Sequence, residues 1–221
     1  DLMLPWVWDQ KLFISNEPGY EYLRVWHNRA REILGHVLIN WCEITTGKDE
    51  TMHQDERQGI VVAVSVSPHT GVPKIPQDTV IVGEHGVVGD FHAGVTNKHK
   101  KSGPSEPNLR QLTIVAQEAL DSANEQLDIA LGAGSIGENV LVDGLGDLSG
   151  LVVGDVLRLG EQVSLRVTSQ NKPCATLNVY HGDIVKTLLG IRGVAAVVDS
   201  TGVIKTGDTV LVERVERSKT K

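Results

Sequence analysis

The sequence predicts a mainly β protein, a barrel or a sandwich with a few short helices (α+β), preceded by a helical extension. From Gly59 onward, short β-prone segments alternate with turn residues, and helical spacing is confined to two brief stretches. The absence of regularly alternating helices argues against a parallel doubly wound sheet. All aromatic residues except Phe91 and Tyr180 fall within the first 41 positions. This asymmetry indicates an N-terminal module whose packing differs from that of the rest.

The N-terminal extension, residues 1–58, is expected to contain one amphipathic helix and a linker. Apolar residues recur three and four positions apart from about Gly19 to Trp41, a spacing that lines one face of a helix. We expect this face to pack on the main domain, or on a second copy in a homodimer, rather than to line a cofactor pocket. The polar segment from Thr45 to Gln58 is typical of a linker.

The main domain, residues 59–216, is predicted to contain eight strands and two helices. The expected strands are Ile60–Val66, Thr79–Val82, Leu112–Val115, Asn139–Val142, Val156–Leu159, Val163–Thr168, Val194–Val198 and Thr209–Glu213. The expected helices are Ala116–Gln126 and Ile184–Leu189. A closed barrel would remove exposed strand edges.

Composition and charge exclude several classes of function. The formal net charge of −7 argues against a nucleic-acid-binding protein, which would need a clustered basic face. No segment approaches the roughly 20 apolar residues that cross a membrane. The two cysteines lie far apart and form no disulfide framework, which favours a reducing compartment. We therefore expect a cytoplasmic protein with no nucleic-acid or membrane partner.

The most distinctive segment is the polar stretch Asn171–Thr176, which holds Cys174. Structural cysteines usually lie within apolar runs. Pro173 stiffens the backbone before the thiol, and a cation such as Lys172 favours the thiolate, the form that attacks electrophiles and binds soft metals. Local context alone leaves open a functional thiol and an ordinary structural cysteine.

Two other segments carry groups with candidate chemistry. Asp90 follows a glycine, as in the turns Gly154-Asp155 and Gly207-Asp208, so it is either a turn residue or a functional carboxylate. His92 is either a proton carrier or ligand, or a structural histidine. Arg110 suits contact with a phosphate, or else a surface ion pair, and Lys74 lies in a loop shaped by two prolines and a glycine that leaves its direction open.

The glycine-rich segment Gly132–Asn139 matches the letters of a dinucleotide-binding fingerprint. That fingerprint requires a helix after the glycines, whereas this segment leads into a predicted strand. We therefore expect no NAD or FAD site. The loop amides either bind an anion or simply form a hairpin connection.

Taken in order, these motifs resemble the MOSC domain, named for the C-terminal domain of molybdenum cofactor sulfurases. The resemblance covers about Gly59 to Val215, and the chain looks most like the small free-standing bacterial members. It is carried by Ser67-Pro68, Gly89-Asp90, His92-Ala93-Gly94, Arg110-Gln111, Gly137-Glu138-Asn139, Gly154-Asp155 and Pro173-Cys174. It implies a β-barrel that handles the molybdenum–pterin cofactor (molybdopterin) or sulfur destined for it.

The resemblance also implies site roles. Cys174 would bind molybdenum or carry a persulfide, and Asp90 and His92 would lie near the reacting centre, with Asp90 orienting His92. The implied cofactor-binding residues are Lys74, Arg110, Gln111, Gly134, Gly137, Glu138 and Asn139. The segment Val95–Leu109 is longer than the family's usual spacing, as a lid or an insertion would be.

Three functions follow as alternatives. The first is a molybdenum-dependent reductase component that uses Cys174 as metal ligand and receives electrons from a separate reductase. The second is a sulfur carrier whose Cys174 persulfide comes from a cysteine desulfurase, without turnover of its own. The third is an assembly domain with an inert cysteine.

Overall fold

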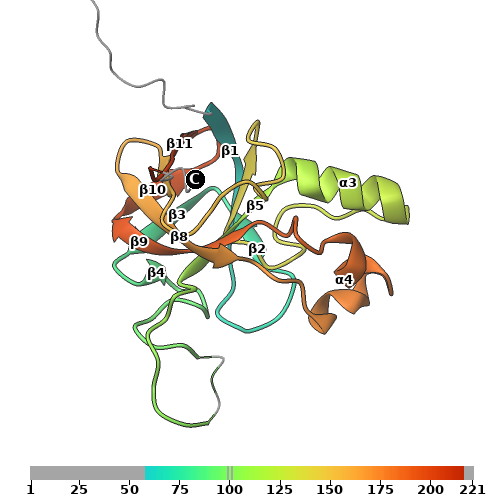
Figure 1. The fold of residues 1–221 in the computed structure, drawn as a ribbon, viewed down its shortest axis with the longest axis horizontal. Coiled ribbons are helices and arrows are strands. Elements are labelled where there is room, and N and C mark those ends of the chain that lie inside the picture. The colour runs from blue at the N-terminus through green and yellow to red at the C-terminus, as the bar shows by residue number, and fades with distance from the viewer. Residues whose placement is uncertain (1–57, 99, 101, 217–221) are drawn as a thin grey trace, which may run out of the picture. The chain divides into compact units, whose positions relative to one another are not determined.

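The computed structural model describes residues 58–98, 100 and 102–216, in which a β-barrel carries its helices on one side (Figure 1). The predicted helix at Gly19–Trp41 and nearly all of the predicted linker lie outside these residues. The barrel strands are β1 (Gln58–Val66), β5 (Leu112–Ala116), β6 (Val140–Asp143), β7 (Val156–Leu159), β8 (Val163–Gln170), β9 (Val194–Ser200) and β11 (Thr209–Glu213). The other strands are β2 (Ile75–Gln77), β3 (Thr79–Gly83), β4 (Gly86–Val87) and β10 (Gly202–Lys205). The helices are α3 (Gln117–Leu127), α4 (Ile184–Thr187) and the 3₁₀ helix η2 (Ala175–Val179).

The barrel closes where its first strand meets its last. The strand order is β11-β7-β8-β9-β5-β6-β1, and β1 returns to β11 through the antiparallel pairs that begin at Gln58 and Leu211. Closure confirms the predicted barrel over the sandwich. Neighbouring barrel strands are antiparallel except β5 and β6, which are parallel and are joined by α3. A parallel pair needs such a crossover connection.

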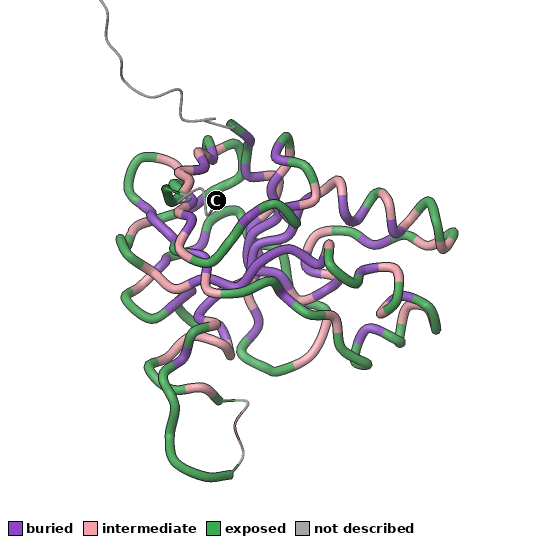
Figure 2. The backbone as a smooth tube through the Cα atoms, in the orientation of Figure 1, coloured by how far each residue is buried: buried purple, intermediate pink, exposed green. Residues whose placement is uncertain are grey.

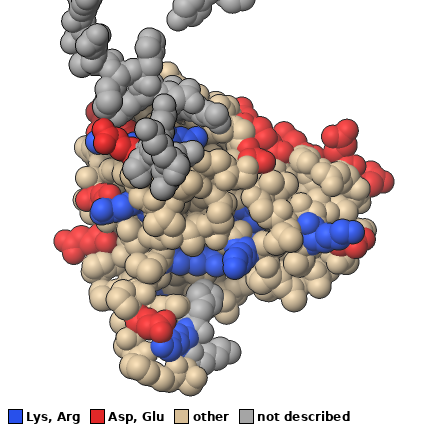
Figure 3. Space-filling view, viewed as in Figure 1, with Lys and Arg blue, Asp and Glu red and all other residues tan. Residues whose placement is uncertain are grey.

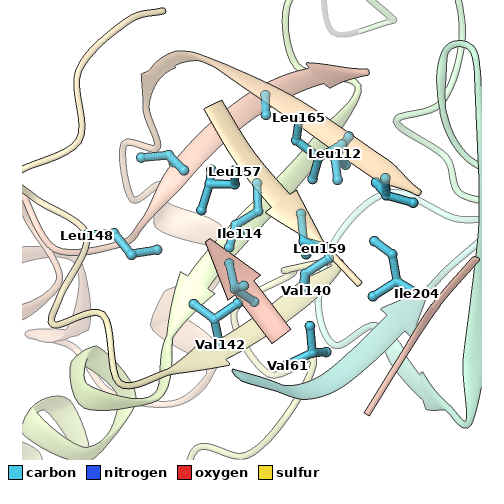
Figure 4. Packing of buried hydrophobic residues seen from close by; sticks show 14 of the residues in the cluster. Val61, Leu112, Ile114, Val140, Val142, Leu148, Leu157, Leu159, Leu165 and Ile204 are labelled. Carbon is cyan, nitrogen blue, oxygen red and sulfur yellow. The ribbon is translucent and has the colours of Figure 1, made fainter. Parts of the chain in front are cut away.

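Alternation along the strands divides the apolar residues between two cores. Leu112, Ile114, Val140 and Val142 point into the barrel with the leucines of β7 and β8 (Figure 4). The intervening residues of β5 and β6 face outward, where Leu141 packs under the helices. Figure 2 shows the buried strands running through the centre of the fold. Because both of its faces are covered, β5 is buried along its whole length.

Most predicted elements match the structure to within two residues. Strands β7 and β11 have the predicted bounds, and α3 is shifted by one residue. The second predicted helix is shorter and ends at Thr187. The strands β2, β4 and β10 and the helix η2 were not predicted. Each strand among them has only two to four residues and contains glycine or proline, so its pattern is too short to distinguish from a turn.

A long loop between β4 and β5 extends away from the barrel and is largely exposed (Figures 1 and 2). Its base is fixed by Asn108, whose side-chain amide donates to the carbonyls of His92 (2.7 Å) and Gly94 (3.0 Å). These two hydrogen bonds hold the segment of His92 against the residues just before β5. Across the described residues, the structure has no helix of the length and hydropathy required to span a bilayer.

Candidate functional site

The predicted residues Lys74, Asp90, His92 and Asn139 form one buried cluster, which we call the Asp90 cluster. Asp90 Oδ2 accepts hydrogen bonds from Lys74 Nζ (2.7 Å) and Asn139 Nδ2 (2.9 Å), and from the amide of Ser67 (3.1 Å). Asp90 Oδ1 accepts from the amide of His92 (2.9 Å) and lies 3.2 Å from its Nδ1. The carboxylate therefore connects four separate positions and is fully hydrogen-bonded.

The ionisation of the cluster follows from these contacts. Burial by itself raises the pKa of the Asp90 carboxyl, but hydrogen bonds from His92 and the charge of Lys74 outweigh it and hold the pKa well below its usual range. Burial lowers the pKa of Lys74, and Asp90 opposes that shift. The side chains of Lys74 and Asp90 are only 1% and 0% exposed, so the pair is a desolvated ion pair.

His92 contacts Asp90 Oδ1 through both its amide and its ring Nδ1. A neutral histidine whose Nδ1 lies against a carboxylate carries its proton on that nitrogen. The His92 ring also packs edge-on against Phe91, at 5.5 Å between ring centroids.

Two predicted cofactor-binding residues bond mainly to the protein backbone. Asn139 Oδ1 accepts from the Thr113 amide (3.2 Å), while its Nδ2 also donates to the Ser65 carbonyl (3.2 Å). Asn139 thus joins β5, β1 and Asp90. Gln111 Oε1 accepts from the Val198 amide (2.9 Å), which ties the start of β5 to β9. These contacts position the strands that carry the site.

The amides of the glycine-rich loop bind a carboxyl group of the chain itself. Glu138 is 1% exposed, and its carboxylate accepts from the amides of Gly134 and Ile136. Burial raises the pKa of Glu138, and the backbone hydrogen bonds oppose this shift. The sequence offered an anion-binding loop and a hairpin connection as alternatives. In the structure these two amides are occupied by Glu138.

Only glycine fits at position 134 of this loop. Its φ of +79° is unfavourable for other residues, and a Cβ would lie 2.2 Å from the Lys74 carbonyl oxygen. The amide of Lys74 in turn donates to the Gly134 carbonyl (2.9 Å). The loop is therefore docked against the backbone that carries the buried lysine of the Asp90 cluster.

The second group is the Cys174 loop, defined as Asn171–Thr176. Cys174 lies directly before η2, and the first two residues of η2 complete the loop. The Cys174 thiol is exposed and free, and Sγ lies 3.0 Å from the Thr176 hydroxyl. Partial burial raises the pKa of the thiol, but hydrogen bonds from Thr176 and the charge of Arg192 outweigh this and lower it below its ordinary value. The loop is anchored by Leu177 of η2, which is fully buried beneath the helices.

Arg192 is a site residue that sequence reasoning missed. It is 5% exposed and directly precedes Gly193 and β9. Its Nη1 donates to the Lys172 carbonyl (2.8 Å) and lies 4.0 Å from Cys174 Sγ, and its Nη2 donates to the Ile136 carbonyl (2.7 Å). Arg192 thus braces the Cys174 loop against the glycine-rich loop. An arginine between two glycines, just before an apolar strand, was the available sequence clue.

Arg110 approaches the Cys174 loop from the start of β5. Its Nη2 donates to Asn171 Oδ1 (2.6 Å), and its charge interacts with Arg192, Cys174 and Lys74. The Asp90 cluster, the glycine-rich loop and the Cys174 loop are therefore close enough for their charges to interact.

Basic side chains form a band across the middle of the face in Figure 3, with acidic ones mainly toward its outline. Within the described residues, no group of three or more His, Cys, Asp or Glu side chains is arranged to hold a metal ion.

Comparison with known proteins agrees with this architecture. The model of the MOSC domain family matches residues 89–211. The YuaD protein of Bacillus subtilis (strain 168) is 31% identical over 159 residues, which cover 60% of this chain and 78% of YuaD.

Solved structures show the same fold. The crystal structure of Bacillus subtilis YuaD superposes with a TM-score of 0.63 at 23% identity, covering 73% of this chain and 98% of that one. YiiM from Escherichia coli superposes with a TM-score of 0.54 at 24% identity, over 72% of each chain. The family match spans more than half of the sequence and includes Asp90, Arg110, Asn139 and Cys174. The chain belongs to the MOSC domain family.

Proposed function

We propose that this protein binds the molybdenum cofactor through Cys174 and serves as a component of a molybdenum-dependent reductase. The observation that carries the proposal is an exposed thiol with a lowered pKa, held on a braced loop beside two arginines. A thiolate is a preferred ligand for soft metals. The family to which the chain belongs supports the same assignment.

The residues around Cys174 fit this cofactor in two respects. The thiol offers one soft ligand, and the pterin part of the cofactor carries an anionic phosphate that arginine recognises well. Among the described residues, the Nε atoms of Arg110 and Arg192 are buried and have no hydrogen-bond partner. Such atoms are expected where a binding group is completed by a ligand or by ordered water.

In this proposal each residue of the site has a defined role. Arg192 and Thr176 hold the Cys174 sulfur in place and favour its thiolate. Arg110 supplies positive charge, while Asp90 pairs with Lys74 and orients His92. When bound, the cofactor supplies the redox chemistry of the metal. Electrons would come from a separate reductase.

The decisive experiment is metal and pterin analysis of protein purified from a host that makes the cofactor. We expect near-stoichiometric molybdenum and pterin in the wild type and loss of molybdenum in Cys174→Ser. Circular dichroism must show that the variant is folded. Full retention of molybdenum in folded Cys174→Ser would reject Cys174 as the ligand.

A sulfur-carrier function is the second candidate, and it is favoured by the exposure of Cys174. An exposed thiol with a lowered pKa suits direct transfer from a partner protein. The relative YuaD carries a name that links it to metal-sulfur cluster biosynthesis. A cysteine desulfurase would be the donor. Mass spectrometry after incubation with cysteine and a desulfurase, without reducing agent, should show one added sulfur on Cys174, and an unmodified thiol would contradict this candidate.

A further inference from the structure

Arg110 and Arg192 gather positive charge beside Cys174, and the carboxyl group that acts on Arg192, that of Glu138, is turned toward the amides of its own loop. Neither arginine forms an ion pair with an Asp or Glu among the residues that the structure describes. Their oxygen partners are neutral, namely the Asn171 side chain and the Lys172 and Ile136 carbonyls, and Arg192 Nη1 also lies 4.0 Å from Cys174 Sγ. Like charges held together in a poorly solvated site are costly unless an anion compensates them.

The chain as a whole would repel anions, because its formal net charge is −7. Arg192 is 5% exposed, and its Nη1 is directed at the Cys174 sulfur. The two Nε atoms, both buried, have no partner within the described part of the chain. The positive charge is thus local to the thiol and incompletely satisfied.

We propose that Arg110 and Arg192 make Cys174 selective for anionic partners, that is, for ligands with a carboxylate or phosphate group next to the atom that meets the sulfur. Guanidinium groups recognise both anions through paired hydrogen bonds. The inference deepens the proposed function by naming the charge class of what reaches Cys174. Its test needs no bound cofactor, so failure of metal binding and failure of this selectivity are separately observed.

The test compares alkylation of Cys174 in the full chain by iodoacetate, which is anionic, and by iodoacetamide, which is neutral. In both reactions the thiolate sulfur forms a bond to carbon and iodide leaves with the bonding electrons. The fraction of thiolate therefore cancels in the ratio of the two rates. Peptide mass spectrometry separates Cys174 from Cys42.

We expect the iodoacetate-to-iodoacetamide rate ratio of the native protein to exceed that of the urea-unfolded chain by about threefold or more, as one nearby charge would produce at a partly exposed site. Arg110→Met and Arg192→Met should each lower the ratio. Arg158→Met is the matched control, because Arg158 is exposed and paired with Glu213, and it should leave the ratio unchanged. Protection by inorganic phosphate would assign the site to a phosphate-bearing ligand, and protection by acetate alone to a carboxylate.

A native ratio no higher than the unfolded ratio would overturn the proposal, as would unchanged ratios in both variants. Arg192 also braces two loops, so Arg192→Met tests the proposal only if it folds. Arg110 makes a single side-chain hydrogen bond, to Asn171, so Arg110→Met should disturb the fold little. The rate ratio of this variant, together with the ratios of the native and the unfolded protein, decides whether the proposal holds.

Discussion

The Asp90 cluster and the Cys174 loop are both polar, but they differ in how completely their groups are satisfied. Asp90 accepts from four residues, and its side chain is fully buried beside its lysine partner. The Cys174 thiol is exposed, and the nearby arginines retain buried atoms without partners among the described residues. The first arrangement is complete within the protein, whereas the second leaves donors for a ligand. The Asp90 cluster therefore positions the site, whereas the Cys174 loop and its arginines offer groups for binding.

The largest effect that this comparison predicts is loss of stability on changing Asp90. In Asp90→Asn the new NH2 group would meet a donor in either orientation of the amide, and the lysine charge would be unpaired. We expect a loss of about 3–5 kcal/mol in the free energy of unfolding, measured by urea titration.

Asp199→Asn serves as control for Asp90→Asn, because Asp199 pairs with an exposed arginine. Its expected cost is below about 1 kcal/mol. Equal costs for the two variants would contradict the distinction between the buried cluster and the surface.

The next largest effect on stability concerns the glycine-rich loop. Gly134→Ala would place a Cβ against the Lys74 carbonyl at a positive φ, with an expected loss of about 1–3 kcal/mol. Gly132→Ala, in the same loop, meets no atom within 4 Å and should change stability by less than about 1 kcal/mol. Thermal unfolding of both variants measures the difference, and similar losses would show that docking on Lys74 is unimportant.

Acid should remove the stabilisation that Asp90 provides. Because the pKa of Asp90 is lower in the folded than in the unfolded chain, its contribution is fully present above about pH 4, the ordinary pKa of an aspartate. It is lost as the pH falls below that value toward the folded pKa. Urea midpoints between pH 7 and pH 3 should fall less steeply in Asp90→Asn than in the wild type. Parallel curves would mean that Asp90 has an ordinary pKa.

The smallest expected effect on stability is that of Cys174→Ser. The thiol is exposed, so its replacement should change the free energy of unfolding by less than about 0.5 kcal/mol. Urea titration of the cofactor-free variant and wild type provides the measurement. A loss above about 2 kcal/mol would place Cys174 among the structural residues and weaken the comparison.

Strands were predictable where alternating apolar residues lie between turn-forming residues. Strands β7 and β11 follow the Gly-Asp turns at Gly154 and Gly207, and their bounds were predicted without error. Strand β2 was missed because Pro76 interrupts a segment that is exposed at every position. Which strands close the barrel is decided by pairing between distant segments, which local periodicity does not encode.

The site was partly predictable for a similar reason. Cys174 was recognisable because it lies in a polar segment after Pro173, and the pairing of Asp90 with His92 is local. Arg192 was not, because it contacts carbonyls 20 and 56 positions away in the sequence. Glu138 bonds to amides only four and two positions away, but the sequence pattern did not show that its side chain would turn back onto its own loop.

The junction of β1 and β11 has a consequence for biosynthesis. During translation β1 leaves the ribosome before any other barrel strand, and β11 leaves last. The edge of β1 at Gln58–Ile60 therefore waits for its partner until nearly the whole domain has been made. An unpaired edge can join a strand of another chain. The nascent protein thus keeps this edge open to misassembly until its last strand emerges.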